Sequence, residues 1–341
     1  MQDRAIRRQL FSPKSRHFHS GQSGRDLQDD SGTGCIPDED ATRNPGGPGF
    51  RALKKLIINA DDLGLTPGVN RGILRAFQDG IVTSASLLVT GSAFEEAVAL
   101  ARQNPELDVG LHLTLVEERA VLGHEALPTL VDENGRLPRT SGEFLRRAFL
   151  GRISWKEVER EIAAQIARFQ KTGLRLSHLD SHQHLHMFPP VFQIVRRLTR
   201  GMDNVWVRNP AGPWRKSPRV RMGRWMQRLG LNVTCLSARS LHGPRLPQMP
   251  DGMYGFEVSG CLTRSALEQI FRKIPDGLYE LICHPGEDDA GTRTRYSHWG
   301  YRWAEELEAL TAPETRVVLK EQGIALTSFV LASEMSQGEI L

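Results

Sequence analysis

The pattern of apolar and polar positions changes abruptly near residue 52. Residues 1–51 hold isolated apolar side chains with no period of 2 or 3.6, and residues 1–50 contain seven Gly and four Pro. Such a segment lacks the apolar content that folding requires, so we expect a disordered or loosely attached leader. Residues 52–335 carry regular apolar patterns and are predicted to form a single barrel domain.

Beyond residue 52, short apolar runs alternate with segments whose apolar residues recur at helical spacing. The run Leu56-Ile57-Ile58 predicts a buried strand, and Val69, Ile73 and Phe77 predict a helix over 68–79. Strands that alternate with helices indicate βα units and a parallel sheet, so the predicted fold class is α/β. Further strands are expected at 83–89, 108–113, 174–180, 205–207, 278–283 and 324–329, and further helices at 92–103, 191–200 and twice within 141–172.

Two helix starts are predicted from capping residues. Ser92 is expected to cap the helix over 92–103, because a serine side chain can accept a hydrogen bond from the first turn. Ser154 with Glu157 three residues later has the spacing of a capping box, which predicts a helix start there.

Charge and composition limit the classes of partner. Lys and Arg number 44 against 40 Asp and Glu, and no long basic run is present, so we expect no nucleic-acid partner. No stretch reaches the ~20 apolar residues that a transmembrane helix needs. The cysteines lack CxxC spacing and no apolar run follows Arg4, Arg7 and Arg8, which predicts a reduced protein in the cytoplasm. A homodimer is compatible with these observations.

Chemically competent side chains gather where predicted strands end. Asp61 and Asp62 follow the first strand, His112 lies in the third and His284 ends a late one. In a (β/α) barrel the carboxyl ends of the strands form one mouth, where active sites lie. These residues are therefore predicted to share one site. The alternative is a set of unrelated surface and core residues, His112 being a hydrogen-bonded core histidine and His284 a turn residue.

The adjacent carboxylates Asp61 and Asp62 repel one another, and a cation would relieve that repulsion. One could bind a metal ion while the other stays free as a base. The alternative is that an aspartate caps the following helix.

The densest cluster comprises His178, Asp180, His182, His184 and His186. These residues share one parity, so an extended chain would place them on one face. Imidazoles bind divalent ions at neutral pH, and Asp180 could orient one of them. Spacing leaves open which histidine binds. A solvated turn, or N-cap contacts before the next helix, are the alternatives.

Four segments resemble, in order, the motifs of YdjC-like carbohydrate deacetylases: Asn59–Gly64, Gly110–Thr114, His178–His186 and Cys283–Gly286. Chitooligosaccharide deacetylases and hopanoid-biosynthesis HpnK proteins belong to that family. The resemblance covers about Leu53 to Phe329, and it implies a distorted (β/α) barrel of the glycoside hydrolase/deacetylase type with mostly parallel strands. The implied activity is removal of the acetyl group from an N-acetylated sugar with one divalent metal ion.

Site residues follow from the resemblance by motif position. It implies Asp62, His112 and His182 as metal ligands, Asp61 as general base and His284 as general acid. The family is commonly associated with Mg²⁺, whereas one carboxylate and two imidazoles suit Zn²⁺, Co²⁺ or Mn²⁺, so the metal stays open. Supporting or substrate-contacting roles are expected for Asp180, His178, His186 and Arg208.

The substrate expected from this resemblance is a chito-oligosaccharide or a glycolipid such as an N-acetylglucosaminyl hopanoid. Two alternatives remain: hydrolysis of another amide or ester bond, and a non-catalytic sugar-binding protein, against which the presence of both Asp61 and His284 argues. Candidates for stacking on sugar rings are Trp206, Arg208, Trp214, Tyr254, Trp299 and Trp303, with packing in the core or in loops as the alternative for each. The residues that either cover a lipid tail or form a core helix are Arg224, Trp225, Met226, Leu229 and Leu231.

Overall fold

The structure is a computed structural model that describes residues 54–202, 204–214, 220–241 and 246–338. All of them belong to a compact unit spanning Phe50–Leu341. The predicted leader lies outside the described residues, so its looseness and the boundary at residue 52 stay predictions. Within the described ranges, no helix is both long enough and apolar enough to cross a membrane.

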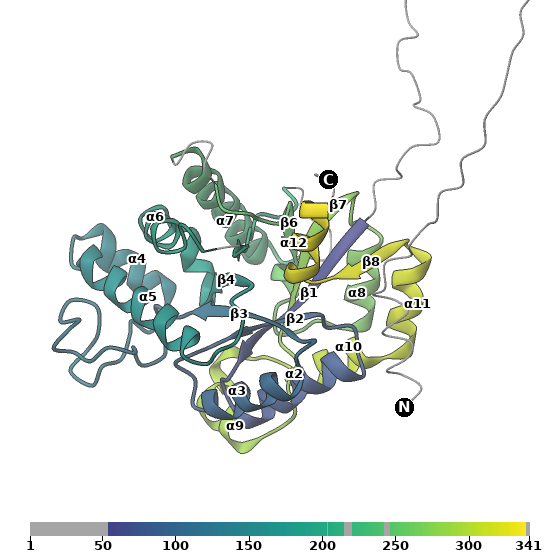
Figure 1. Cartoon of the computed structure of the whole chain (residues 1–341), viewed down its shortest axis with the longest axis horizontal. Coiled ribbons are helices and arrows are strands. Elements are labelled where there is room, and N and C mark those ends of the chain that lie inside the picture. Colours follow the sequence, from purple (N-terminus) through teal and green to yellow (C-terminus); the bar gives the residue numbers. More distant parts are fainter. Residues whose placement is uncertain (1–53, 203, 215–219, 242–245, 339–341) are drawn as a thin grey trace, which may run out of the picture. The chain divides into compact units, whose positions relative to one another are not determined.

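A parallel sheet forms the centre of this unit (Figure 1). Its strands pair in the order β5-β4-β3-β2-β1-β7-β6, and β8 pairs with β1 beside this path. The strands are β1 Lys54–Leu63, β2 Ser84–Leu87, β3 Asp108–Leu113, β4 His178–Ser181, β5 Trp206–Val207, β6 Gly252–Tyr254, β7 Gly277–Cys283 and β8 Ile324–Thr327.

Strand β1 has three neighbours in the sheet, and it is buried from Leu56 to Leu63. One edge pairs with β7, and the other pairs first with β8 and then with β2. The far ends of the sheet approach each other, since an isolated parallel bridge joins Trp206 to Gln248, just before β6. The predicted distorted barrel of mostly parallel strands is therefore confirmed.

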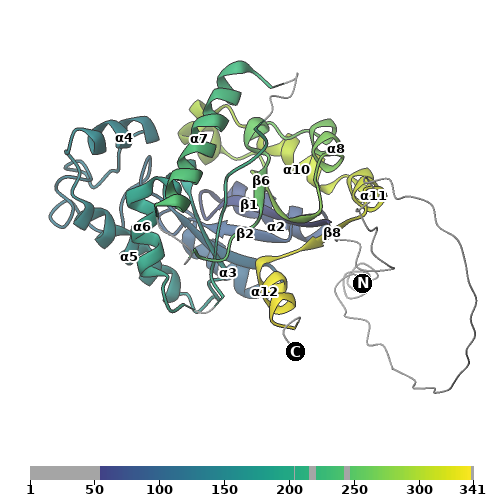
Figure 2. The same ribbon diagram turned by 90° about the horizontal axis from the view of Figure 1, so that it is seen from above.

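Helices cover the outside of the sheet, and Figure 2 shows them from above. Helix α2 packs on α3 and α10, and α6 packs on α5 and α7. The apolar pattern alone assigns no helix to the segments that form α8 to α12, and it leaves a core helix within α7 as one of two alternatives. The helices are α2 Pro67–Gln78, α3 Phe94–Gln103, α4 Ser141–Phe149, α5 Trp155–Gln170, α6 Pro189–Leu198, α7 Met222–Ser240, α8 Arg264–Phe271, α9 Ala290–Arg295, α10 Trp303–Thr311, α11 Pro313–Glu321 and α12 Phe329–Gly338, with 3₁₀ turns η1 His182–Met187, η2 Phe256–Val258 and η3 Ser297–Trp299.

Side chains on β1 alternate between an apolar and a polar environment. Leu56, Ile58 and Ala60 belong to the main apolar core. Residues of the other parity face the opposite way, and the Asn59 amide donates to Asp61 Oδ1 at 2.8 Å. The inner face of the barrel is thus polar toward the carboxyl end of β1, where charged groups can gather.

Helix α12 packs against the amino-terminal half of this inner face. Its Phe329 joins Ile57 and Trp206 in a small apolar cluster, and the Trp206 indole donates to Ser333 Oγ at 2.7 Å. Because these contacts occupy Trp206, a role in sugar stacking is not open to it.

Neither predicted capping hydrogen bond forms, although the predicted helix start at Ser154 is confirmed. Helix α3 begins after Ala93, and Ser92 Oγ instead donates to the carbonyl of Leu65. Ser154 stands at the start of α5 but its side chain accepts no capping hydrogen bond. The Glu157 carboxylate accepts from the amide and hydroxyl of Thr129, because a tertiary contact with two donors outweighs a local cap.

Candidate metal centre

A local distortion of β1 brings Asp61 and Asp62 to the same site. Neighbouring strand residues normally point to opposite faces, but the register with β2 shifts between Ala60 and Leu63. Asp62 adopts a left-handed φ of 68°, which costs roughly 1–2 kcal/mol for a residue with a Cβ. The distortion lets both carboxylates reach the mouth of the barrel.

His112 on β3 points toward Asp62. Its Nε2 lies 3.4 Å from Asp62 Oδ1, and its Nδ1 lies 2.8 Å from Asp180 Oδ1 on β4. A carboxylate on one imidazole nitrogen fixes the ring and leaves the other nitrogen's lone pair for a metal. Burial would raise the pKa of Asp180, but Arg208 and His112 outweigh it and hold that pKa far below its usual range. Asp180 thus stays ionised to orient His112.

Like His112, His182 turns one ring nitrogen toward Asp62 and the other toward a second carboxylate, here that of Glu117. Its Nδ1 lies 3.4 Å from Asp62 Oδ1, and its Nε2 lies 2.7 Å from Glu117 Oε2. The indole of Trp299 donates to Glu117 Oε1 at 3.1 Å and stacks on the His182 ring. Burial lowers the pKa of His182, but Asp62 and Glu117 raise it to about 10. The site therefore favours positive charge at this position.

Glu117 is a functional candidate that the sequence analysis missed. It follows β3 by four residues and has a left-handed φ of 67°, which a sequence pattern does not reveal for a non-glycine residue. The one available signal was its position just after the Gly110–Thr114 motif.

The donor atoms fit a divalent cation. Ligand atoms of Asp62, His112 and His182 all lie within 4.8 Å of one another. Both carboxylate oxygens of Asp62 and Nε2 of His112 are buried and have no hydrogen-bond partner among the described residues. Leaving such groups unpaired is costly, and a bound cation removes that cost. His182 and His112 lower the pKa of Asp62 to about 2 against the opposing effect of burial, so the ligand carboxylate is ionised.

A second group of potential ligands, Asp61, His112 and Asp180, lies equally close together. Its two carboxylates already share the guanidinium of Arg208, which lies 2.6 Å from Asp61 and 2.5 Å from Asp180. Because their oxygens already accept from a protein cation, unlike those of Asp62, this group is the weaker candidate for a metal site.

Arg208 follows β5 and is fully buried. It donates to both carboxylate oxygens of Asp61, at 2.8 and 2.6 Å, and its Nε donates to Glu280 at 2.8 Å. Burial raises the pKa of Glu280 to about 7 although Arg208 opposes the shift. Arg208 therefore holds Asp61 in one orientation, and it is absent from the side chains that line the cavity described below.

The rest of the histidine segment departs from the extended face that its parity predicts. Strand β4 ends at Ser181, and Gln183 and His184 are left-handed, so the chain turns into η1. His186 turns inward, where its Nδ1 meets Ser181 Oγ and its Nε2 meets the carbonyl of Arg208. Burial lowers the pKa of His186 to about 4. The expectation of one shared face is wrong.

His178 also lies away from the metal ligands. Its ring stacks on Phe329 of α12 with 4.0 Å between centroids, and its nitrogens meet Ser177 Oγ and Ser86 Oγ. Burial lowers its pKa to about 4. His178 and His186 are thus neutral structural residues with protein partners, whereas His184 lines the cavity.

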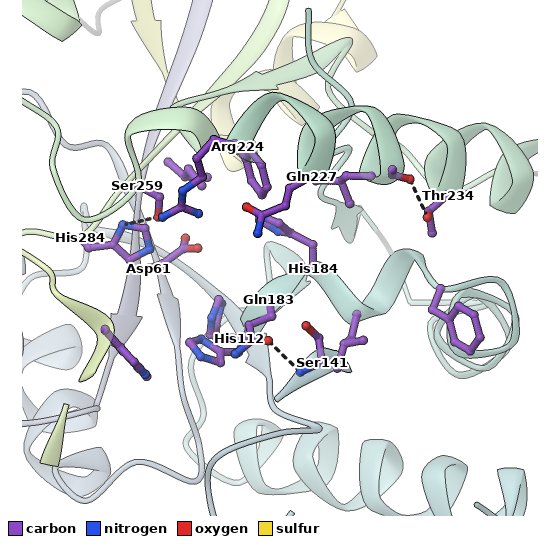
Figure 3. Close-up of a pocket in the computed structure, with 18 of the residues that line it drawn as sticks. Asp61, His112, Ser141, Gln183, His184, Arg224, Gln227, Thr234, Ser259 and His284 are labelled. Atoms are coloured by element: carbon purple, nitrogen blue, oxygen red, sulfur yellow. Dashed lines mark hydrogen bonds between the residues drawn. The ribbon is translucent and has the colours of Figure 1, made fainter. Parts of the chain in front are cut away.

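A cavity of about 610 Å³ opens beside the ligands (Figure 3). Asp61, His112 and His284 lie toward one end of it, and Thr234 of α7 lies toward the other. The ring of His284 lies edge-on to Tyr301, and its backbone amide donates to Glu306 at 2.5 Å. Among the six predicted sugar-stacking candidates, Trp299 lines this cavity.

Comparisons with known proteins agree with this arrangement. The chain is 35% identical to a carbohydrate deacetylase of Geobacillus stearothermophilus over 80% of this chain and 96% of that protein. It is 34% identical to a chitooligosaccharide deacetylase of Serratia marcescens over 81% of this chain and 98% of that protein.

A solved structure with a similar fold comes from Enterococcus faecalis V583, where it is described as a proposed cellobiose-phosphate cleavage protein. It superposes with a TM-score of 0.64 and 30% identity, covering 81% of this chain and 98% of that one. The family model described as YdjC-like protein matches residues 55–321. This match spans more than half of the sequence, so the chain belongs to the YdjC-like protein family.

Proposed function

We propose that the chain is a hydrolase that removes the acetyl group from an N-acetylated sugar with one divalent metal ion. The observation that carries this proposal is that buried ligand atoms of Asp62 and His112, beside a cavity, have no hydrogen-bond partner among the described residues. The relatives named carbohydrate deacetylase and chitooligosaccharide deacetylase support the substrate class.

Asp62, His112 and His182 would hold the metal ion. A divalent ion in such a site polarises a carbonyl oxygen and lowers the pKa of a bound water molecule. One carboxylate and two imidazoles leave further coordination positions open, as catalytic sites require. This ligand set suits Zn²⁺, Co²⁺ or Mn²⁺, whereas Mg²⁺ prefers oxygen ligands.

Asp61 is the proposed general base. Its Oδ1 accepts from Asn59 and Arg208, whereas its Oδ2 accepts from Arg208 alone. A carboxylate oxygen has two acceptor positions, so Oδ2 keeps one for a water molecule. Since Asp61 also lines the cavity, it can take a proton from water that attacks the acetyl carbon.

His284 is the proposed general acid. It lines the same cavity as Asp61, and its Nδ1 lies 3.5 Å from Ser259 Oγ and 4.0 Å from the buried Glu306 carboxylate. An imidazole at this position can protonate the departing amine of the sugar. The two roles thus fall to two groups near one end of the cavity.

Acetate release tests the proposal. Full-length protein loaded with Zn²⁺, Co²⁺, Mn²⁺ or Mg²⁺ in turn is incubated with N,N′-diacetylchitobiose, with and without a chelator. We expect acetate in at least one metal-loaded sample and none with chelator, and the Asp61→Asn variant serves as the inactive control. Binding of the sugar without acetate release would instead indicate a sugar-binding protein, and release from non-sugar amides or esters alone would indicate a different hydrolase.

A further inference from the structure

Helix α7 exposes an unusual amount of apolar surface. Met222, Met226, Val233 and Leu236 are each between 53% and 60% exposed. Their spacing of four, seven and three residues places them on one face of the helix. The opposite face is already buried against the protein and includes Cys235. A surface helix normally turns polar residues outward, so an apolar stripe on the outer face indicates an interaction site.

Further exposed apolar side chains lie at the two ends of α7 and near the cavity. Trp214 before α7 is 52% exposed and Leu241 directly after it is 69% exposed. Phe149 at the end of α4 is 77% exposed, and its ring lies 5.8 Å from that of Phe188, which lines the cavity. The exposed large apolar residues of the described chain thus gather around α7 and the nearby cavity, leaving few elsewhere.

The charge of this region has one sign. Residues 208–250 contain eight Arg and one Lys but no Asp or Glu. Two of these arginines, Arg208 and Arg228, are buried in ion pairs with acidic side chains from other parts of the chain, so they add no free charge to the surface. On and beside α7, Arg221 and Arg239 are exposed at the two ends of the apolar stripe. Nothing on this helix can neutralise them, so the stripe lies within a positive electrostatic field.

We propose that α7 docks on the surface of an anionic lipid bilayer. Met222, Met226, Val233 and Leu236 would enter the boundary between headgroups and acyl chains, and the flanking arginines would meet lipid phosphates. A helix with an apolar stripe flanked by basic residues and no acidic ones has the composition of interfacial membrane helices. A symmetric dimer through α7 fits less well, because it would bring Arg221 and Arg239 of two copies together without an acidic partner.

Helix α7 also forms one wall of the cavity. Gln227, Leu231 and Thr234 on another face of α7 line the cavity (Figure 3). These residues lie about half a turn around the helix from the stripe, so α7 itself would lie between a bound bilayer and the cavity. The binding itself does not depend on the proposed deacetylase activity, so the two can be tested separately.

Vesicle sedimentation of the full-length protein tests this proposal. We expect the protein to sediment with vesicles of equimolar phosphatidylcholine and phosphatidylglycerol, less at high salt, and hardly with phosphatidylcholine alone. The variants Met226→Ser/Val233→Ser and Arg221→Gln/Arg239→Gln should each bind at least about tenfold more weakly, since two arginines near an anionic surface contribute at least that factor. A matched control, Val317→Ser/Arg272→Gln, changes exposed residues on and beside other helices and should bind like the unmodified chain.

Three results would overturn the proposal, provided that circular dichroism shows folded variants. The unmodified chain could fail to bind anionic vesicles. It could bind them no better than the α7 variants do, in which case another segment is responsible. Light scattering could reveal a dimer that the Met226→Ser/Val233→Ser variant converts to a monomer while vesicle binding stays unchanged, which would assign the stripe to self-association.

Discussion

The Glu117 carboxylate lies 2.7 Å from Nε2 of His182, whose other nitrogen faces Asp62. A carboxylate in this position fixes the ring and increases the basicity of the nitrogen that faces the metal site. We therefore infer that Glu117 supports the proposed metal centre through His182.

The first prediction concerns Glu117. The substitution Glu117→Gln keeps the size of the side chain but removes its charge, so metal affinity should fall by about 10- to 100-fold. Calorimetric titration of the metal-free protein with Zn²⁺ measures the change. Glu133→Gln, which alters an exposed residue, is the matched control and should bind Zn²⁺ like the unmodified chain. Equal affinity in both variants would remove Glu117 from the metal centre.

The contrast between Glu117 and the motif residues shows what a sequence reveals about this site. Asp61, His112 and His284 were predicted from their positions at strand ends, because parallel strands bring such ends together. Glu117 reaches His182 because Glu117 itself adopts a left-handed backbone conformation in a loop. The spacing of apolar residues carries no information about such a turn. The same limit explains why His186 does not share a face with the other histidines. That prediction assumed an extended chain, and the left-handed residues Gln183 and His184 end the extended conformation.

The helices of the second half show a related limit. The outer face of α7 is apolar where a surface helix is expected to be polar, so its amphipathic pattern is blurred. Most strands were easier to predict, because most of β1 and all of β3 are continuous runs of buried residues, a pattern typical of parallel sheets covered on both faces. The short strand β6 was not predicted, because its three residues carry no such run.

A second prediction tests Arg208 as the residue that holds Asp61. Arg208→Met leaves Asp61, Asp180 and Glu280 buried without their shared cation, and removing one partner of a buried ion pair costs about 3–5 kcal/mol. Urea denaturation of the metal-free protein should register that loss. Adding Glu280→Gln should recover part of it by removing one carboxylate. Unchanged stability in Arg208→Met would contradict the ion-pair network.

A third prediction concerns the pH dependence of stability. Burial raises the pKa of Glu280 from 4.5 to about 7, so folding favours the protonated carboxyl. The contribution of protonated Glu280 to the free energy of unfolding is complete below pH 4.5 and is lost as the pH rises through 7. The loss amounts to something on the order of 3 kcal/mol.

Comparison with Glu280→Gln isolates this effect. Between pH 4.5 and 7 the free energy of unfolding of the unmodified chain should fall relative to that of the variant, with both samples held metal-free. Denaturation by urea at several pH values measures the difference. Parallel curves would show that Glu280 has an ordinary pKa in the folded protein.

A fourth prediction tests the domain boundary. Residues 1–51 lack the apolar content that would offset roughly 1–2 kcal/mol of ordering entropy per residue. A chain that starts at Ala52 should therefore unfold at the same urea concentration as the full chain and release acetate at the same rate. A lower unfolding midpoint would place the boundary before residue 52.

The fifth prediction separates the roles of Asp61 and Asp62. Asp61→Asn removes the base and should lower turnover by about 10²- to 10⁴-fold while the metal stays bound. Asp62→Asn removes a charged ligand and should lower metal content as well, with partial rescue by excess metal. Each variant serves as the control for the other, because both replace one carboxylate by an amide at adjacent positions.

The most direct measurement is acetate release from N,N′-diacetylchitobiose together with the metal content of these two purified variants. The account predicts one bound metal ion and little acetate for Asp61→Asn, and loss of both metal and acetate for Asp62→Asn. Metal lost from Asp61→Asn but kept by Asp62→Asn would reverse the two roles. Full acetate release by both variants would contradict the proposed site.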